Sequence, residues 1–204
     1  MAEMGLLVAL MEPEAGMQDE FDDWYDLEHI PHMSGVAGLL SAQRFVVVEG
    51  WPRYAAVYDL DGVAVLTSAS YRAVTGGGFS PWSRRILHRV RGWRRLTFEQ
   101  LRPGRATLLE ATGALGMVLC GDESAAGRLA DALTQHPTTL QVRSYVPAAP
   151  GGPGAVLWEA GSLAALARPQ HAELRETTWS ARMVRYGRAD PSAAFARLES
   201  NQSP

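Results

Sequence analysis

The chain has 204 residues, of which 47% are hydrophobic, and a formal net charge of -3 at pH 7. That apolar content is enough to bury a core, so we expect a soluble globular protein of one large domain or two small ones. No stretch approaches the roughly 20 apolar residues of a membrane span, and no basic segment precedes an apolar one at the start, which predicts a cytoplasmic protein without a membrane partner. The one basic cluster, at 82–95, alternates charged with apolar residues as a strand does, so no nucleic-acid partner is expected.

The first half of the chain carries the signals of six elements. Apolar runs predict strands at 5–13, 39–50, 53–62 and 84–92, and helical periodicity predicts helices at 19–30 and 62–78. Pro31 is expected to end the first helix, and the glycines at 76–78 to end the second. The resulting order, βαββαβ, is that of the ferredoxin-like unit, in which two helices cover one face of an antiparallel sheet.

The second half of the chain echoes the first. Tyr58 and Asp59 correspond to Trp158 and Glu159, residues 82–90 resemble residues 179–187, and residues 114–137 again supply a strand and a helix. We therefore predict an α+β fold of two tandem ferredoxin-like βαββαβ repeats. The repeats are placed at 1–101 and 102–188, and a flexible tail at 189–204 contains a short turn at 194–198.

Each predicted repeat would leave one apolar sheet face bare, and the second repeat is the natural cover for the first. Face-to-face pairing of two such sheets is the dimeric-α/β-barrel arrangement, here predicted as a pseudo-dimer within one chain. The sequence leaves open whether two chains pair further as a homodimer. The lone Cys120 lies among apolar residues, so we expect it to be a small core residue.

Residues 20–32 are unusually rich in aromatic, acidic and histidine side chains. If this stretch is helical, Phe21, Trp24, Tyr25, Glu28 and His29 share one face. The acidic side chains early in the helix are stabilised by the positive end of the helix dipole, so they need no catalytic explanation. Tyr25, Glu28 and His29 instead bring polar groups to an inward face, where each needs a partner or water. A purely structural His29, bound to backbone in the last helical turn, remains an alternative.

The string Phe21-x-x-Trp24-Tyr25-Asp26-x-Glu28-His29-Ile30-Pro31, with Gly38 and Arg44-Phe45 after it, resembles the signature of EthD-like proteins in the dimeric α/β-barrel superfamily. The resemblance covers the first predicted repeat. Ala37 stands where that family commonly has Pro, and the second repeat offers only His136-Pro137 as an echo. We therefore expect a functional first repeat covered by a degenerate second one. The resemblance implies enzymes of small ring compounds, including polyketide cyclases, decarboxylases, cofactor-free monooxygenases and isomerases.

Most barrels of this kind bind an aromatic or enolisable molecule and move protons, a task that suits an imidazole. We expect His29 to be the acid or base, with Glu28 and Tyr25 as its catalytic partners, although Glu28 is also placed to bind Arg44. Arg44 is a candidate for holding a carboxylate or phenolate, or else it pairs with a surface Asp. The other predicted substrate-binding residues are Trp24, His32, Tyr54, Tyr58 and His88. If the shared strand face of Tyr54 and Tyr58 lines the barrel, both phenols enter it. His88 is expected to alternate with Ile86 and Val90 on one strand face. The alternative is that His88 is a core histidine whose hydrogen bonds are all made within the protein.

A metal site is the rival interpretation, because Glu28, His29 and His32 are close in sequence. Pro31 breaks the helix between the two histidines, and the H-E-x-x-H spacing typical of zinc-binding helices is absent. We therefore expect neither metal nor haem nor another cofactor. The leading hypothesis is a cofactor-independent cyclase, lyase (decarboxylase) or isomerase acting by proton transfer on a small aromatic or polyketide-like molecule. The alternatives are a non-catalytic small-molecule-binding or oxygenase-accessory protein and a cofactor-free monooxygenase.

Overall fold

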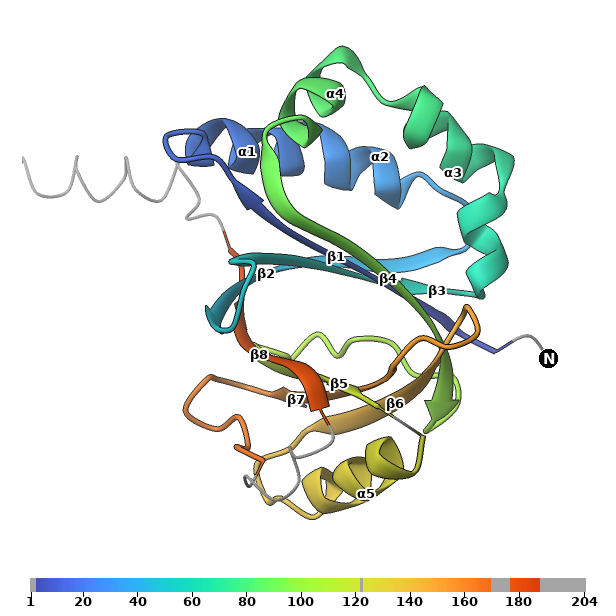
Figure 1. Cartoon of the computed structure of the whole chain (residues 1–204), viewed down its shortest axis with the longest axis vertical. Coiled ribbons are helices and arrows are strands. Elements are labelled where there is room, and N and C mark those ends of the chain that lie inside the picture. Colours follow the sequence, from blue (N-terminus) through green and yellow to red (C-terminus); the bar gives the residue numbers. More distant parts are fainter. Residues whose placement is uncertain (1–2, 122, 170–176, 188–204) are drawn as a thin grey trace, which may run out of the picture.

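The computed structural model describes residues 3–121, 123–169 and 177–187. Within these ranges the strands form one closed antiparallel barrel in the order β1-β3-β2-β8-β5-β7-β6-β4 (Figure 1). The strands are, in chain order, β1 (Gly5–Pro13), β2 (Leu39–Glu49), β3 (Tyr54–Leu60), β4 (Val90–Arg102), β5 (Ala114–Cys120), β6 (Gln141–Pro147), β7 (Gly154–Ala160) and β8 (Thr177–Arg185).

The helices lie on two opposite sides of the barrel. Figure 1 shows α1 to α4 above the strands of the first half and α5 beneath those of the second half. The helical segments are α1 (Gln18–Trp24), the π-helical turn η1 (Tyr25–His29), α2 (Ile30–Ser34), η2 (Val63–Thr67), α3 (Ala69–Val74), η3 (Gly76–Gly78), α4 (Pro81–Leu87) and α5 (Glu123–Thr134). None of these described helices has the length and apolar character needed to cross a membrane.

Alternation along the strands divides the apolar residues into an inner core and two outer ones. On β3, Ala55 and Val57 point into the barrel, where they pack with residues such as Phe45, Phe98 and Met183. The other face of the same strand, which carries Tyr54, Ala56 and Tyr58, packs against the helices of the first half. The third core lies between the second-half strands and α5, and it contains the buried Cys120 as predicted.

The two hairpins of the barrel have matching registers. Ser41 of β2 lies opposite Asp59 of β3, and Gln141 of β6 lies opposite Glu159 of β7. The strand order also recurs, because β1 is flanked by β3 and β4 just as β5 is flanked by β7 and β8. The predicted hairpin of the second and third strands is confirmed, and so is the first strand.

Buried charges occupy one end of the barrel interior. Arg143 Nη1 donates to Asp59 Oδ1 at 2.7 Å, and Arg143 Nε lies 2.9 Å from Glu159 Oε1. All three side chains are essentially inaccessible to water. The backbone N–H groups of Leu108 and Leu109 donate to the same two carboxylates, so the connection between β4 and β5 is tied to this end of the barrel.

The first helix is longer than predicted. It runs from Gln18 to Ser34, with a π-helical turn at Tyr25–His29 in which the N–H of Ile30 donates to the carbonyl of Tyr25. A proline inside a helix removes one hydrogen bond and crowds the carbonyl four residues before it. The widened π turn directly precedes Pro31, which then occupies the first turn of α2, where its missing N–H costs least. The expectation that Pro31 ends the helix is therefore wrong.

The strand predicted at 84–92 is wrong over most of its length. Residues Pro81–Leu87 form α4, and β4 begins only at Val90. Ser80 accepts a hydrogen bond from the backbone N–H of Ser83, and Pro81 follows it, which together are the signals of a helix start. The proposed echo of residues 82–90 in 179–187 fails with it, because Trp179 lies on strand β8.

Two further predictions need correction. The helix predicted at 62–78 is divided into η2, α3 and η3, because Ser68 caps α3 by accepting from the N–H of Tyr71. In the second half, α5 is confirmed, whereas residues 161–169 contain no second helix. The predicted tail at 189–204, its turn at 194–198 and residues 170–176 lie outside the described part of the chain.

Candidate active site

A small cavity lies between the outward sheet face of the first half and its helical cover. Its volume is about 50 Å³. Strands β1, β3 and β4 form its floor, and residues of α1, η1, α2 and the segment around α4 form its roof. The lining residues are Leu7, Ala9, Met11, Trp24, His29, Met33, Tyr58, Phe79, Leu87, Trp93 and Arg95. Three of the predicted site residues, Trp24, His29 and Tyr58, therefore meet in one place.

His29 is held in this cavity by aromatic contacts. Its ring stacks on Trp24 with the centroids 4.6 Å apart, and Tyr25 meets its edge at 5.2 Å. Within the described residues its imidazole has no hydrogen-bond partner, so the alternative of a backbone-bonded structural histidine finds no support there. Burial, followed by the nearby His32, lowers the pKa of His29 to about 4. The imidazole is therefore neutral at pH 7 and able to accept a proton.

Two buried phenols stand behind His29. The Tyr58 hydroxyl has no hydrogen-bond partner within the described part of the chain, although it is buried. The Tyr25 hydroxyl reaches the sulfur of Met11 at 3.7 Å, and it lies close enough to the Tyr58 hydroxyl for the two phenols to shift each other's pKa. Burial raises the pKa of Tyr25 to about 12, and burial followed by the adjacent Tyr25 raises the pKa of Tyr58 well above its ordinary value. Both phenols therefore keep their protons at pH 7 and act as hydrogen-bond donors.

Glu28 turns away from His29 and joins two helices. Its Oε1 accepts hydrogen bonds from the hydroxyls of Ser80 at 2.6 Å and Ser83 at 2.9 Å. The indole of Trp24 in turn donates to Ser83 at 3.0 Å. Burial acts to raise the pKa of Glu28, but the two serine hydrogen bonds outweigh it and the pKa is lowered. Glu28 is thus an ionised group that joins η1 to α4, and the alternative in which it pairs with Arg44 is wrong.

Arg44 forms a separate cluster with two aspartates beside the Tyr25 ring. It pairs with Asp22 and, at 2.8 Å, with Asp26, and the Tyr186 ring centroid lies 3.9 Å from its Cζ. Burial acts to lower the pKa of Arg44, but the hydrogen bonds that its guanidinium donates to the two aspartates outweigh burial and raise it. The structure therefore matches the alternative prediction, in which Arg44 pairs with a nearby Asp. The arginine of this pair is buried, however, and does not lie on the surface.

The remaining predicted residues lie apart from the cavity. His32 and His88 are exposed, and His88 follows α4 instead of lying on a strand, so its predicted alternation with Ile86 and Val90 is wrong. Tyr54 shares the outward face of β3 with Tyr58 as predicted. That face packs against the helices, however, so the condition that it lines the barrel interior is not met.

Sequence reasoning missed several residues around the site. Phe79, Trp93 and Arg95 line the cavity, and Trp93 is 58% exposed at its edge. Trp93 and Arg95 alternate on β4, but the misplaced fourth strand hid that pattern. Asp22 and Asp26 stand four residues apart, so their shared helix face could have been recognised as a cradle for one cation.

No group of three or more metal-ligating side chains occurs in the described part of the chain. The candidates Glu28, His29 and His32 diverge, because Glu28 is held by serines.

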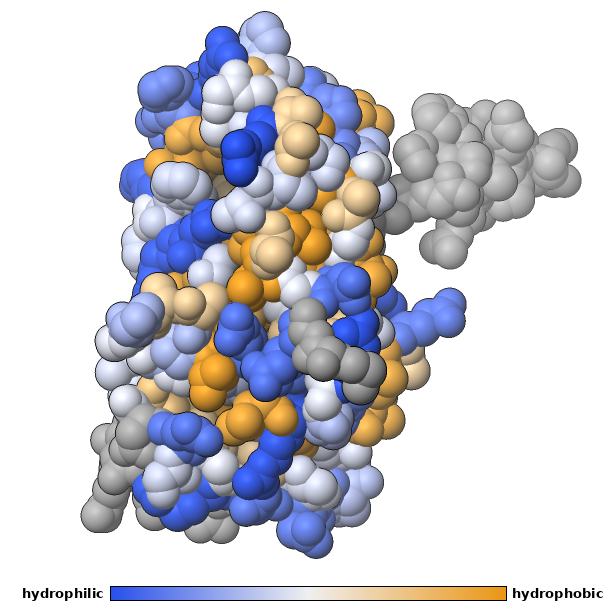
Figure 2. All heavy atoms as spheres, turned by 90° about the vertical axis from the view of Figure 1, so that its right-hand side faces the viewer, coloured by the Kyte–Doolittle hydropathy of each residue, from blue (hydrophilic) through white to orange (hydrophobic). Residues whose placement is uncertain are grey.

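Figure 2 shows a mostly hydrophilic face with hydrophobic residues gathered in smaller patches.

No protein-family model matches this sequence, and no curated protein matches it either. Solved structures do resemble it. An anthrone oxidase-like protein superposes with a TM-score of 0.60 at 11% identity, over 92% of each chain. A candidate monooxygenase of Lactobacillus acidophilus gives 0.58 at 7% identity, over 90% of this chain and 94% of its own. A variant of chlorite dismutase from Candidatus Nitrospira defluvii gives 0.55 at 10% identity, over 91% and 92%.

The chain has the dimeric α/β-barrel fold. The closed eight-stranded antiparallel barrel and these likenesses over at least 90% of the chain agree on that point. Within this fold the small cavity lies between sheet and helices, on the first-half side.

Proposed function

We propose that the protein is an enzyme that moves a proton on a small phenolic or enolisable ring compound, without a cofactor, in the cavity at His29. The observation that carries this proposal is the meeting of a neutral imidazole and an unpartnered buried phenol in one cavity. Buried polar groups are nearly always paired, so an unpaired buried hydroxyl beside a neutral imidazole is characteristic of a site that awaits a ligand.

The proposed chemistry divides between the two groups. His29 accepts the acidic proton of the substrate, and the Tyr58 hydroxyl donates a hydrogen bond to the oxygen on which negative charge develops. A pKa near 4 makes His29 a weak base in the empty site. The anion formed beside it stabilises the imidazolium, which raises that pKa at the moment of transfer. The same imidazolium then returns the proton to another atom of the substrate in an isomerase or cyclase.

The substrate must open the cavity before it can bind. A volume of about 50 Å³ holds a water molecule but no aromatic ring. Phe79 and Leu87 belong to the cover that follows the glycines of η3, and Trp93 stands half-exposed at the edge. We expect this cover to move away from the sheet to admit the substrate and then to close over it, which excludes water from the closed complex.

A second candidate function, cofactor-free oxygenation, shares the first step. The names of two structural neighbours refer to oxidation or oxygenation. An enolate formed at His29 gives up electrons to dioxygen more readily than the neutral substrate does. With anthrone as substrate, one dioxygen would be consumed and anthraquinone and water formed.

Anthrone is therefore the first probe, because it is enolisable and tests both functions. Under nitrogen in D₂O, the wild type should exchange the methylene hydrogens of anthrone faster than buffer does, as followed by NMR. His29→Gln should lose at least about a hundredfold of that acceleration, which is the usual worth of a general base. His88→Gln, an exposed histidine outside the cavity, is the matched control and should retain it.

The other outcomes separate the alternatives. Oxygen uptake with anthrone in air, lost in His29→Gln, would favour the oxygenase. Binding of anthrone without exchange or uptake would favour a carrier or accessory protein. Equal exchange in the wild type and His29→Gln would contradict the proposed role of His29.

We also propose that the chain is an EthD-like protein built of two tandem repeats, at 1–101 and 102–188. Support comes from the motif of η1 and from the matching registers of the two hairpins, in which Asp59 and Glu159 occupy corresponding places. The recurrent strand order adds to it. If this is right, the two halves form a pseudo-dimer in one chain.

A further inference from the structure

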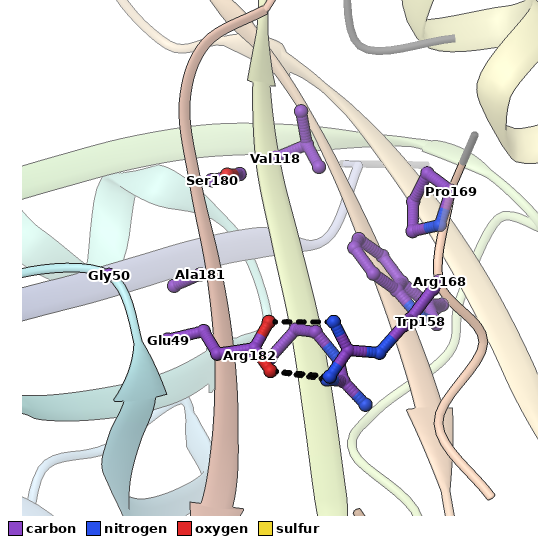
Figure 3. A pocket seen from close by; sticks show the side chains of 9 residues that line it. All are labelled: Glu49, Gly50, Val118, Trp158, Arg168, Pro169, Ser180, Ala181 and Arg182. Atoms are coloured by element: carbon purple, nitrogen blue, oxygen red, sulfur yellow. Dashed lines mark hydrogen bonds and ion pairs between the residues drawn. The ribbon is translucent and has the colours of Figure 1, made fainter. Parts of the chain in front are cut away.

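A second cavity lies on the outward sheet face of the other half of the barrel. Its volume is about 220 Å³, and its walls come from β5, β7, β8, the end of β2 and the segment after β7 (Figure 3). None of its lining residues belongs to the cavity at His29. It is therefore a separate space, and larger than the first.

This second cavity carries an excess of positive charge. Two guanidinium groups, those of Arg168 and Arg182, share the single carboxylate of Glu49. Figure 3 shows Glu49 and the two arginines gathered at one side of the cavity. One carboxylate against two guanidinium groups leaves a net charge of about +1 in the lining.

Arg182 is the buried member of the pair. The residue is only 8% exposed, and its Nη2 donates to the carbonyls of Leu163 and Leu166. Its Nε–H is buried and has no hydrogen-bond partner in the described ranges. A buried, charged donor without an acceptor is costly, and a ligand oxygen would relieve that cost.

Another part of the lining is flat and apolar. The Trp158 indole is fixed there by a 3.0 Å hydrogen bond to the carbonyl of Ala167 and by Gly116, at which a Cβ would come within 2.1 Å of the ring. Val118 extends the same surface. A fixed aromatic wall beside a cationic end is complementary to a flat molecule that carries an anion at one edge.

The strand registers place the two cavities at corresponding points. Trp158 lies opposite Gly116 on β5, as Tyr58 lies opposite Leu7 on β1. The chemistry of the two differs, since the first cavity offers a neutral imidazole and a phenol and the second offers two guanidinium groups.

We propose that the second cavity binds a small carboxylate with a flat apolar body. Its carboxylate takes the Nε–H of Arg182 and the fork of Arg168, and its body lies against Trp158. Glu49 occupies the Arg168 fork when the site is empty and turns out to solvent when the ligand enters, as its 46% exposed side chain permits. The inference is independent of the function proposed for His29.

Benzoate is the probe, and benzamide is its neutral counterpart of the same shape. Isothermal titration calorimetry of the full-length protein should show benzoate binding at least about tenfold more tightly than benzamide, as a charge-assisted contact requires. Arg168→Gln should weaken benzoate binding about tenfold, whereas Glu49→Gln should strengthen it, because it removes the competing carboxylate. Both side chains are well exposed, so both variants should fold.

Matched controls come from an exposed ion pair elsewhere. Arg89→Gln and Glu14→Gln change the charge equally but touch neither cavity, so benzoate binding should not change. His29→Gln should also leave it unchanged. The proposal is overturned if benzoate does not bind at millimolar concentration or if benzamide binds equally well. It is also overturned if Arg168→Gln weakens benzoate binding no more than Arg89→Gln does, or if Glu49→Gln weakens it. Loss of benzoate binding in His29→Gln would likewise contradict it.

Discussion

The Tyr58 hydroxyl is buried against the helices without a partner in the described part of the chain, and such a group costs about 1–3 kcal/mol. Tyr58→Phe removes that cost and keeps the ring. We therefore expect the free energy of unfolding to stay constant or rise by up to about 1 kcal/mol in urea denaturation, while anthrone exchange falls.

Tyr145→Phe is the matched control inside the barrel. The Tyr145 hydroxyl accepts a hydrogen bond from Gln100 at 3.3 Å, so its removal should lower the free energy of unfolding by about 1 kcal/mol. If Tyr58→Phe destabilises the protein as much as Tyr145→Phe does, Tyr58 is a packing residue with an unseen partner and its proposed role fails.

The depressed pKa of His29 has a signature in stability as well as in catalysis. The folded value is about 4, against an ordinary value of about 6.5 in the unfolded chain. Between these values the unfolded chain binds a proton that the folded chain does not. The free energy of unfolding should therefore fall as the pH drops from about 6.5 to about 4, by at most about 1.4 kcal/mol per pH unit, and His29 should add no pH dependence above that window.

Thermal denaturation across this window measures the effect. His29→Gln should flatten the pH dependence, whereas His88→Gln should keep it. The acid limb of the anthrone exchange rate should likewise lie nearer pH 4 than pH 6.5. An acid limb near pH 6.5, together with an unchanged stability slope in His29→Gln, would mean that the imidazole is solvated and not buried.

At this scale the sequence predicted some neighbours and not others. Trp24, His29 and Tyr58 line one cavity, because helical and strand periodicity determine which side chains share a face, although Tyr58 reaches it on the helix-facing side of β3 and not inside the barrel. Periodicity does not say which polar partners two packed elements offer each other. The partners of Glu28 are serines of α4, a helix that had been predicted as a strand.

Among the elements, α4 connects the site to its cover. Ser80 both caps α4 and donates to Glu28, so Ser80→Ala should remove two hydrogen bonds and lower the free energy of unfolding by about 1–2 kcal/mol. Ser68→Ala removes the cap of α3 without touching a carboxylate and should cost less. Urea denaturation of the two variants measures the difference. Equal losses would show that the Glu28 contact contributes nothing.

Two of the errors at the level of elements have local causes in the sequence. Alternating Arg and apolar residues after Trp82 imitate a strand, while the short local signal of Ser80 and Pro81 determines a helix. Likewise, Pro31 would end an uninterrupted α-helix, but the π turn before it allows the helix to continue through the proline. The strands of the first hairpin were predictable because their turn and their alternation agree.

At the scale of the whole molecule, the sequence predicted α+β architecture and antiparallel hairpins. The correspondence of Asp59 with Glu159 was visible in the sequence, but its use was not. Both acids lie inside the barrel, where they bind one arginine, Arg143, and the backbone of the connection between β4 and β5. Only closure of the barrel brings β3 and β6 side chains together, so no local pattern could reveal this contact.

Arg143→Met tests whether this charge cluster holds the barrel closed. Replacing Arg143 leaves two carboxylates buried without their cation, so the free energy of unfolding should fall by about 3–5 kcal/mol. Release of the Leu108 and Leu109 contacts should also expose the connection, and trypsin should then cleave after Arg105 faster than in the wild type. Arg89→Gln, which breaks only an exposed pair, should cost less than about 1 kcal/mol and leave the cleavage rate unchanged. A loss below about 1 kcal/mol in Arg143→Met would mean that both carboxylates take up protons at little cost, and that packing alone closes the barrel.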